Sequence, residues 1–268
     1  AIINKFQLGY CPNQRASFIK HAVKNGYSKD LLLKTGLASG NEERMYDRYQ
    51  GRVIFPIHNL TGKVIGFGAR ILSGDKTKAK YLNSPESEIY NKSQTLYGIY
   101  FAKSEISRLD NCILVEGYAD VLSMHQAGIE NVVASSGTSL TTEQIRLISR
   151  YTKNVTILYD GDNAGIHAAL RGTDMILEEG LNVRIVVLPP DEDPDSFVQN
   201  NPIETVLSYI ADNARDFISF KTKLLLKDAA NDPIKKAAVV KDIVNSISVI
   251  PDAIYRATYI KECSRLME

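Results

Sequence analysis

Three acidic positions in the second half of the chain share one kind of sequence context. Glu116 directly follows the apolar run 112–115, and Asp160 and Asp162 follow the apolar run 155–159. Carboxylates that converge repel one another, because two unit charges about 4 Å apart cost roughly 4 kcal/mol at an effective dielectric of 20. A cation removes that repulsion. Oxygen ligands of this kind favour Mg²⁺ or Mn²⁺ over zinc, and a two-metal site suits attack at phosphorus. These acids therefore predict metal-dependent phosphoryl chemistry.

A further acidic run occupies residues 191–195, after the apolar segment 183–188 and two prolines. Taken singly, each acid is better explained by a turn, a helix N-cap or a solvated loop. Three strand ends that all carry carboxylates favour a shared metal site instead.

The acids depend on elements that bring the strand ends together. From residue 111 onward, apolar β-branched runs alternate with helical patterns. The expected strands are 112–115, 132–134, 155–159 and 183–188, and the expected helices are 119–127, 142–151 and 164–179. This alternation predicts a parallel sheet covered by helices, with ligands outside the carboxyl ends of the strands. If the first and third strands are neighbours, about 4.8 Å apart, Glu116 and Asp160 come within reach of shared metals.

The rest of the chain shows other patterns. Residues 1–40 predict short helices, with Ser28 as an N-cap, and residues 52–72 predict a β-hairpin. After residue 202 the apolar spacing is helical to the end. We therefore expect an α/β protein. Its expected parts are an α+β N-terminal subdomain (1–108), a central Rossmann-like parallel sheet (109–201) and a C-terminal helical subdomain (202–268).

Charge divides the chain, although the net charge is only +1. Residues 44–103 hold ten Lys or Arg against four acids, a net charge of +6, whereas residues 157–195 hold two Arg against nine acids, a net charge of −7. A basic tract suits phosphates, and an acidic tract suits hard divalent cations. The alternative is two solvated faces of opposite sign.

Composition argues against several other classes of protein. Hydrophobic residues make up 44% and charged residues 24%, and no apolar run approaches the roughly 18 residues that span a bilayer. The three cysteines lack CxxC spacing and the four histidines lack metal-ligand spacing, so we expect neither a disulfide framework nor zinc. No secretory signal pattern opens the chain, and we expect a cytoplasmic location without membrane association.

Specific motifs extend this interpretation. The segments VEGYAD at 115–120 and YDGDNAG at 159–165 resemble the TOPRIM domain of primases and topoisomerases. Further segments resemble the catalytic core of bacterial DnaG-type primases: DRY at 47–49, RVIFPI at 52–57, GFGAR at 66–70, KYLNSP at 80–85 and LYG at 96–98. This resemblance covers roughly residues 1–200 and implies DNA-dependent synthesis of short RNA primers for replication.

The resemblance also implies roles for individual residues. It makes Glu116, Asp160 and Asp162 the catalytic metal ligands, with Asp120, Asp193 and Asp195 nearby. The positions implied to bind nucleic acid or nucleotide are Arg48, Arg52, Arg70, Lys80, Tyr81, Asn83 and Lys92. Arg offers a planar fork to phosphate oxygens, Lys a mobile charge and Tyr a stacking surface. Asn83 is equally well explained as a turn residue.

The same acids could serve a TOPRIM-type metal-dependent nuclease or a topoisomerase fragment, or hold a structural metal in a binding module. The basic tract at residues 44–103 and the primase-like motifs within it favour a primase over these alternatives. The resemblance then implies Mg²⁺ or Mn²⁺, a single-stranded DNA template, an RNA primer and ribonucleoside triphosphates. For the full-length protein it implies a replicative helicase and a single-stranded DNA-binding protein as partners. It also implies a zinc-binding domain and a helicase-interaction domain, and we expect neither signature within this sequence.

Overall fold

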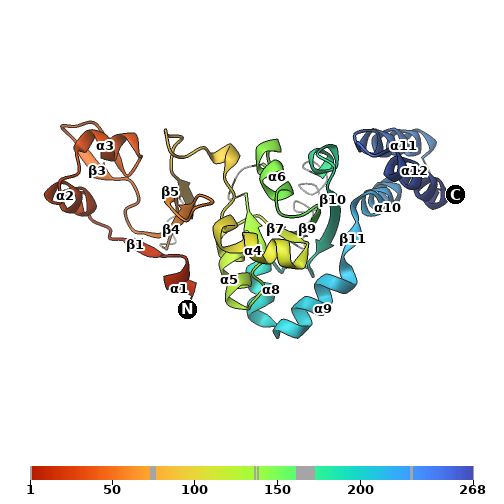
Figure 1. Ribbon diagram of the computed structural model, residues 1–268, viewed down its shortest axis with the longest axis horizontal. Helices are drawn as coiled ribbons and strands as arrows, with labels where there is room; N and C mark the ends of the chain where they lie inside the picture. Colours follow the sequence, from red (N-terminus) through yellow and green to blue (C-terminus); the bar gives the residue numbers. More distant parts are fainter. Residues whose placement is uncertain are drawn as a thin grey trace. The chain divides into compact units, whose positions relative to one another are not determined.

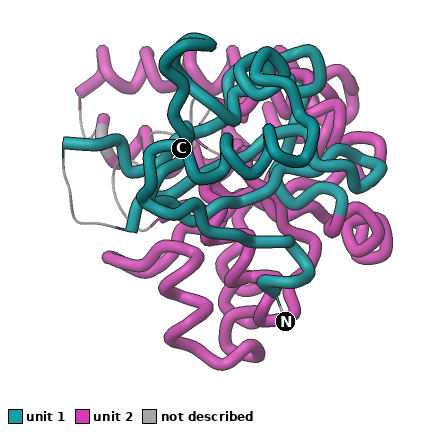
Figure 2. Tube along the Cα trace, turned by 90° about the vertical axis from the view of Figure 1, so that its left-hand side faces the viewer, with its two compact units in different colours: residues 1–100 teal, residues 101–268 magenta. Residues whose placement is uncertain are grey.

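The computed structural model divides the chain into two compact units, residues 1–100 and residues 101–268 (Figure 2). It describes residues 2–72, 77–135, 137, 139–160, 173–229 and 232–267. Figure 1 labels the helices and strands of both units.

The first unit is built on a four-stranded antiparallel sheet. Its strands are β1 (Gly9–Cys11), β4 (Arg52–His58), β5 (Val64–Ile71) and β6 (Tyr81–Asn83), in the order β1-β4-β5-β6. The predicted hairpin is confirmed, since β4 and β5 pair antiparallel. Its turn is closed by Asn59, whose Oδ1 accepts hydrogen bonds from the Thr61 and Lys63 amides, both at 3.0 Å. β6 has three residues, pairs only with β5 and forms an edge of this sheet.

Short elements outside this sheet also begin in the first unit. They are α1 (Ile2–Lys5), α2 (Ser17–Lys24), α3 (Lys29–Lys34), β2 (Ala38–Gly40), β3 (Met45–Asp47), the 3₁₀ turn η1 (Lys92–Gln94) and α4 (Ile99–Leu109), which crosses into the second unit. Ser28 caps α3 as predicted, because its hydroxyl accepts from the Leu31 amide at 3.2 Å. Asp47 is almost fully buried and accepts from the amides of Phe18 and Ile19, so a β3 side chain caps α2.

The second unit contains the predicted parallel sheet. Four strands run parallel: β7 (Cys112–Val115), β8 (Val132–Ala134), β9 (Asn154–Tyr159) and β10 (Asn182–Val187). The order is β11-β10-β9-β7-β8, where the two-residue strand β11 (Arg215–Asp216) adds an antiparallel edge that the sequence did not predict. Nearly every residue of β7, β8 and β9 is buried, as expected for strands covered on both faces.

Helices follow the strands as expected. α5 (Tyr118–Gln126) follows β7 and α6 (Thr142–Ser149) follows β8. Thr141 and Gln144 form a capping box at the start of α6, with N–O distances of 3.2 and 3.1 Å. The expected helix 164–179 is described only from residue 173, and residues 173–178 are helical. α8 (Pro194–Asn200) packs beside α5 (Figure 1).

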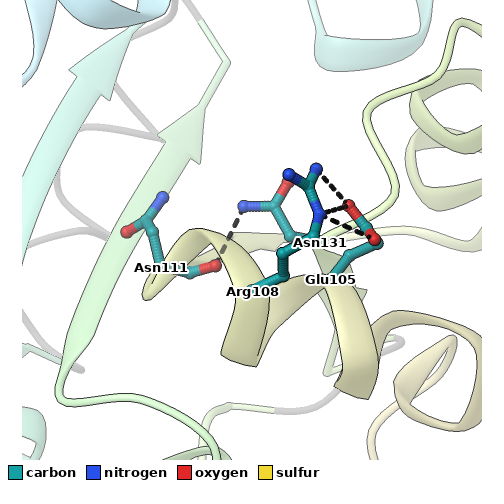
Figure 3. A network of polar contacts seen from close by, with 4 residues as sticks. All are labelled: Glu105, Arg108, Asn111 and Asn131. Atoms are coloured by element: carbon teal, nitrogen blue, oxygen red, sulfur yellow. Dashed lines mark hydrogen bonds and ion pairs between the residues drawn. The ribbon is translucent and has the colours of Figure 1, made fainter.

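Polar contacts fix the amino ends of the strands, opposite the end that carries the acids. Asn131, just before β8, donates to the Asn111 carbonyl at 2.9 Å, while its own carbonyl accepts from the Ile113 amide at 2.9 Å (Figure 3). Nearby, Arg108 and Glu105 form a bidentate ion pair on α4 (Figure 3). The side chains of Asn131 and Arg108 are thus hydrogen-bonded within the protein, where they stabilise the fold.

The chain ends in helices, as predicted. They are α9 (Ile203–Asn213), α10 (Phe217–Ala229), α11 (Pro233–Ser248) and α12 (Ala253–Met267), and the last three pack on one another (Figure 1). A buried lysine, Lys221 of α10, joins this group: its Nζ lies 2.7 Å from the Ser246 hydroxyl and 3.1 Å from Asp242, both on α11. No helix in the described residues is both long and apolar enough to cross a membrane.

Candidate metal and nucleic-acid sites

Glu116 and Asp160 leave the sheet from neighbouring strands. β7 and β9 are hydrogen-bonded partners, and their register pairs Leu114 with Ile157. Each acid directly follows the last residue of its strand, at the carboxyl end. The first and third expected strands are therefore neighbours, which was the condition for Glu116 and Asp160 to share metals, and neighbouring strands lie about 4.8 Å apart. Glu116 also raises the pKa of the buried Tyr159 hydroxyl, although burial of that hydroxyl is the larger cause.

Asp120 lies in the first turn of α5, close to these strand ends. Its Oδ2 accepts a hydrogen bond from the Gly117 amide at 2.8 Å, which fixes the carboxyl group at the start of the helix. Burial raises the pKa of Asp120 to about 7, the Gly117 amide opposes this rise, and the charges of Asp193, Asp160 and Asp195 add to it. Four carboxyl groups from different elements thus share one electrostatic neighbourhood.

The two acids near α8 already have local partners. Asp193 is the N-cap of α8, and its Oδ1 accepts from the Ser196 amide at 2.7 Å. Asp195 accepts hydrogen bonds from Ser123 of α5 and from Gln199 of α8. These bonds orient both carboxylates, and each group keeps lone pairs that a cation could use.

The donor set fits a hard divalent cation in its chemistry. All of its members are carboxylates. Besides burial, the charges of Asp193, Asp160 and Asp195 raise the pKa of Asp120, and a bound metal relieves repulsion of this kind. Among the described residues, no three His, Cys, Asp or Glu side chains are grouped closely enough to hold a metal. Asp162 lies outside the described residues, so the predicted ligand set is represented only in part.

In the first unit, the predicted nucleic-acid residues gather around β5 and β6. Arg70 and Tyr81 are cross-strand partners, and the Arg70 guanidinium lies 5.7 Å from the Tyr81 ring centroid, within cation–π range. Lys80 is exposed at the start of β6, and Asn83 ends that strand opposite Gly68. Arg48 donates to the Asn83 carbonyl at 3.4 Å. This grouping brings together side chains that can contact phosphates and stack on a base.

Of that group only Lys80 is exposed, and the two remaining predicted residues are half-buried or buried. Lys92 is half-buried in η1, and its amide donates to the Glu86 carboxylate at 3.0 Å. Arg52 is 7% exposed, and its guanidinium donates to the carbonyls of Ala79 and Lys80 at 2.9 and 3.3 Å. Burial lowers the pKa of Arg52. The Arg52 side chain is thus turned toward backbone and away from solvent.

Family comparisons match three consecutive parts of the chain. Residues 1–103 match the N-terminal domain of the DNA primase catalytic core, residues 113–198 match a Toprim-like domain, and residues 218–268 match the DnaB-helicase binding domain of primase. Together with the acids at the strand ends, these matches define a nucleic-acid enzyme of the Toprim class, and membership in that class implies use of a divalent metal.

Similarity to whole proteins and solved structures narrows this class. A DNA primase from Clostridium acetobutylicum is 40% identical over 264 residues, covering 98% of this chain and 43% of that relative. A DNA primase domain from Pseudomonas aeruginosa is 33% identical with a TM-score of 0.90, covering 99% of this chain and 84% of that domain. A DnaG primase catalytic domain bound to single-stranded DNA is 34% identical with a TM-score of 0.87, covering 98% and 86%. The chain belongs to the DnaG-type DNA primase family.

One expectation from the sequence was wrong. We expected no helicase-interaction signature within this chain, yet residues 218–268 match such a domain. The sequence signal there is only helical spacing of apolar residues, which any packed helix bundle shares. In the structure, Ile234 and Val244 of α11 are 83% and 52% exposed, a feature that the sequence alone does not reveal.

Proposed function

We propose that this chain synthesises short RNA primers on single-stranded DNA by metal-dependent nucleotidyl transfer. The observation that carries the proposal is the adjacency of β7 and β9, whose carboxyl ends lead into Glu116 and Asp160 in a chain of the DnaG family. The chain spans 43% of the length of its Clostridium acetobutylicum relative, so the proposal concerns the catalytic part of such a protein.

Glu116, Asp160 and Asp162 are the proposed metal ligands, with Asp120, Asp193 and Asp195 completing the acidic surroundings. When bound, Mg²⁺ or Mn²⁺ would lower the pKa of the primer 3′-hydroxyl and stabilise the pyrophosphate leaving group. The protein itself contributes hydrogen bonds that orient some of these carboxylates. The Gly117 amide fixes Asp120, and the hydroxyl of Ser123 orients Asp195.

Residues of the first unit are proposed to bind the template, primer and nucleotide. Arg48, Arg70 and Lys80 supply positive charge for phosphates, and Tyr81 supplies a ring on which a base can stack. Support comes from their common location around β5 and β6 and from the similar primase domain that was solved with single-stranded DNA. The affinity of such a surface should fall steeply with added salt.

Residues 218–268 are proposed to bind the replicative helicase. Support comes from the family match to this segment and from apolar side chains of α11 that solvent reaches, namely Ile234, Val240 and Val244. A single-stranded DNA-binding protein remains an expected partner of the full-length protein. We retain the division into 1–108, 109–201 and 202–268 as the proposed functional parts.

Template-directed incorporation of labelled ribonucleotides on single-stranded DNA tests the proposal. We expect products of a few nucleotides to tens of nucleotides that require Mg²⁺ or Mn²⁺ and all nucleotides encoded by the template. Incorporation that ignores the template sequence would contradict a primase. A Toprim nuclease or topoisomerase would instead nick or relax supercoiled plasmid without incorporation, and the family matches do not favour that alternative.

A further inference from the structure

Arg52 occupies one row of residues that crosses the whole sheet of the first unit. The strand register pairs Arg52 of β4 with Cys11 of β1 on one side and with Ile71 of β5 on the other. The Ile71 amide donates to the Lys80 carbonyl at 3.0 Å, which continues the row to the start of β6. The Arg52 guanidinium reaches past Ile71 to that same carbonyl and to the carbonyl of Ala79.

The burial of Arg52 commits its charge to these backbone acceptors. Its side chain is 7% exposed, and an arginine stays protonated even where burial lowers its pKa. A buried cation is tolerated when its donors meet acceptors, and hydrogen bonds from a charged donor are stronger than neutral ones. A phosphate could use only the donors that these two bonds leave, on a residue that is 7% exposed.

The segment that Arg52 grips carries the side chains proposed to bind nucleic acid. Lys80 and Tyr81 directly follow Ala79, and Tyr81 stacks with Arg70. β6 is a three-residue edge strand, paired with β5 through Asn83, Leu82 and Tyr81. So short a strand has few ladder bonds, and the two bonds from Arg52 act at its entry, next to the exposed Lys80.

We propose that Arg52 is a positioning residue for nucleic-acid binding, which fixes the backbone at Ala79 and Lys80 so that Lys80, Tyr81 and Arg70 meet the strand together. The inference rests on the proposed function, because it assumes that these three side chains contact nucleic acid. It differs from the role that the family resemblance implied for Arg52, which was direct contact.

A double-mutant cycle separates the two roles. Arg52→Met keeps the aliphatic stem and removes the donors, and the binding of a fluorescent single-stranded oligonucleotide is measured over a range of salt. We expect about a tenfold loss of affinity in the unsubstituted background. In a Lys80→Ala, Tyr81→Ala background, the same change should cost less than about twofold and leave the salt slope unchanged, because the two side chains that follow the fixed backbone are gone.

Direct contact of Arg52 with phosphate predicts a different result. Arg52→Met would then lose the same factor in both backgrounds and lower the salt slope by about 0.7 in each. That result, or unchanged affinity in the first background, would overturn the inference alone. Failure of the unsubstituted chain to bind the oligonucleotide would overturn the proposed function and this inference with it.

Further variants test whether a loss of affinity in Arg52→Met comes only from misfolding. Arg52→Lys retains a cation that can donate to the Ala79 or Lys80 carbonyl, and we expect it to recover most of the affinity. Arg52→Gln, which removes the charge and keeps a polar side chain, carries the same cycle if Arg52→Met does not fold. Lys63→Met, an exposed lysine beside the β4–β5 turn, is the matched control, and it should bind within about twofold of the unsubstituted chain.

Discussion

Leu114 of β7 and Ile157 of β9 are register partners in the parallel sheet of the second unit. The side chains of both are buried, so packing on the face to which they point holds the pairing. Two residues beyond Leu114 and three beyond Ile157, the chain reaches Glu116 and Asp160. The pairing of Leu114 with Ile157 thus fixes the positions at which Glu116 and Asp160 leave the sheet.

The acids should bind divalent metal tightly enough to stabilise the folded chain. At a Mg²⁺ or Mn²⁺ concentration of 100 times its Kd, the free energy of unfolding should rise by about 2.7 kcal/mol. Thermal melts with and without metal measure this gain. Glu116→Gln should lose most of it, whereas Glu143→Gln, an exposed acid on α6, should keep it. Equal gains in both variants would place the metal elsewhere.

Asp47→Ala should destabilise the first unit. The side chain is almost fully buried and accepts from two amides of α2, at 2.8 Å from Phe18 and 3.0 Å from Ile19, and alanine would leave both donors unpaired. We expect a loss of about 2 kcal/mol in the free energy of unfolding by urea. Asp30→Ala, an exposed acid on α3, should change it little. A similar loss in both would remove the special role of Asp47.

Lys221→Met should loosen the C-terminal helices. The lysine is buried and its ammonium meets Ser246, Asp242 and, at 3.7 Å, Asp174. The two aspartates are partly exposed and can be hydrated, so we expect a loss of about 2 kcal/mol rather than the larger cost of a fully buried pair. Urea unfolding followed by fluorescence or circular dichroism measures it. Lys223→Met, on the exposed side of the same helix, should have no comparable effect.

His58 should make stability depend on pH. Burial lowers its pKa from the ordinary 6.5, and the Pro56 carbonyl opposes this only in part. The unfolded chain therefore binds a proton more readily than the folded chain. The stabilisation is present above pH 6.5 and is lost as the pH falls through 6.5 toward the lower folded pKa.

Urea unfolding of His58→Gln between pH 5 and pH 7.5 checks this linkage. The substitution should flatten the pH dependence across that range, because the titrating group is gone. His21→Gln on the exposed face of α2 serves as the matched control. An unchanged slope in His58→Gln would assign the pH dependence to other groups.

The strands of the second unit could be predicted from sequence to within one residue, because each is a short buried run of β-branched residues. β11 could not, since two residues form no pattern and pair only through tertiary packing. The cap at Asp193 was predictable from the sequence Asp-Pro-Asp-Ser, in which proline follows the cap.

The environment of Arg52 could not be predicted from its residue type. A basic residue in a basic tract suggests a surface role, and its acceptors lie at Ala79 and Lys80, more than 25 residues away. Only the register of four strands brings those carbonyls within reach. Local sequence patterns predict helices and strands. Hydrogen-bond partners that are distant in sequence depend on how those helices and strands pair.

The most direct test of the account is ribonucleotide incorporation by Asp160→Asn on a single-stranded template, with template binding measured in parallel. The substitution keeps the size of the side chain and removes its charge. We predict at least about a 100-fold loss of incorporation with nearly unchanged binding. Asp191→Asn is the matched control, since Asp191 is an exposed acid with a φ of 65° that asparagine tolerates. Full incorporation by Asp160→Asn would contradict the proposed metal site.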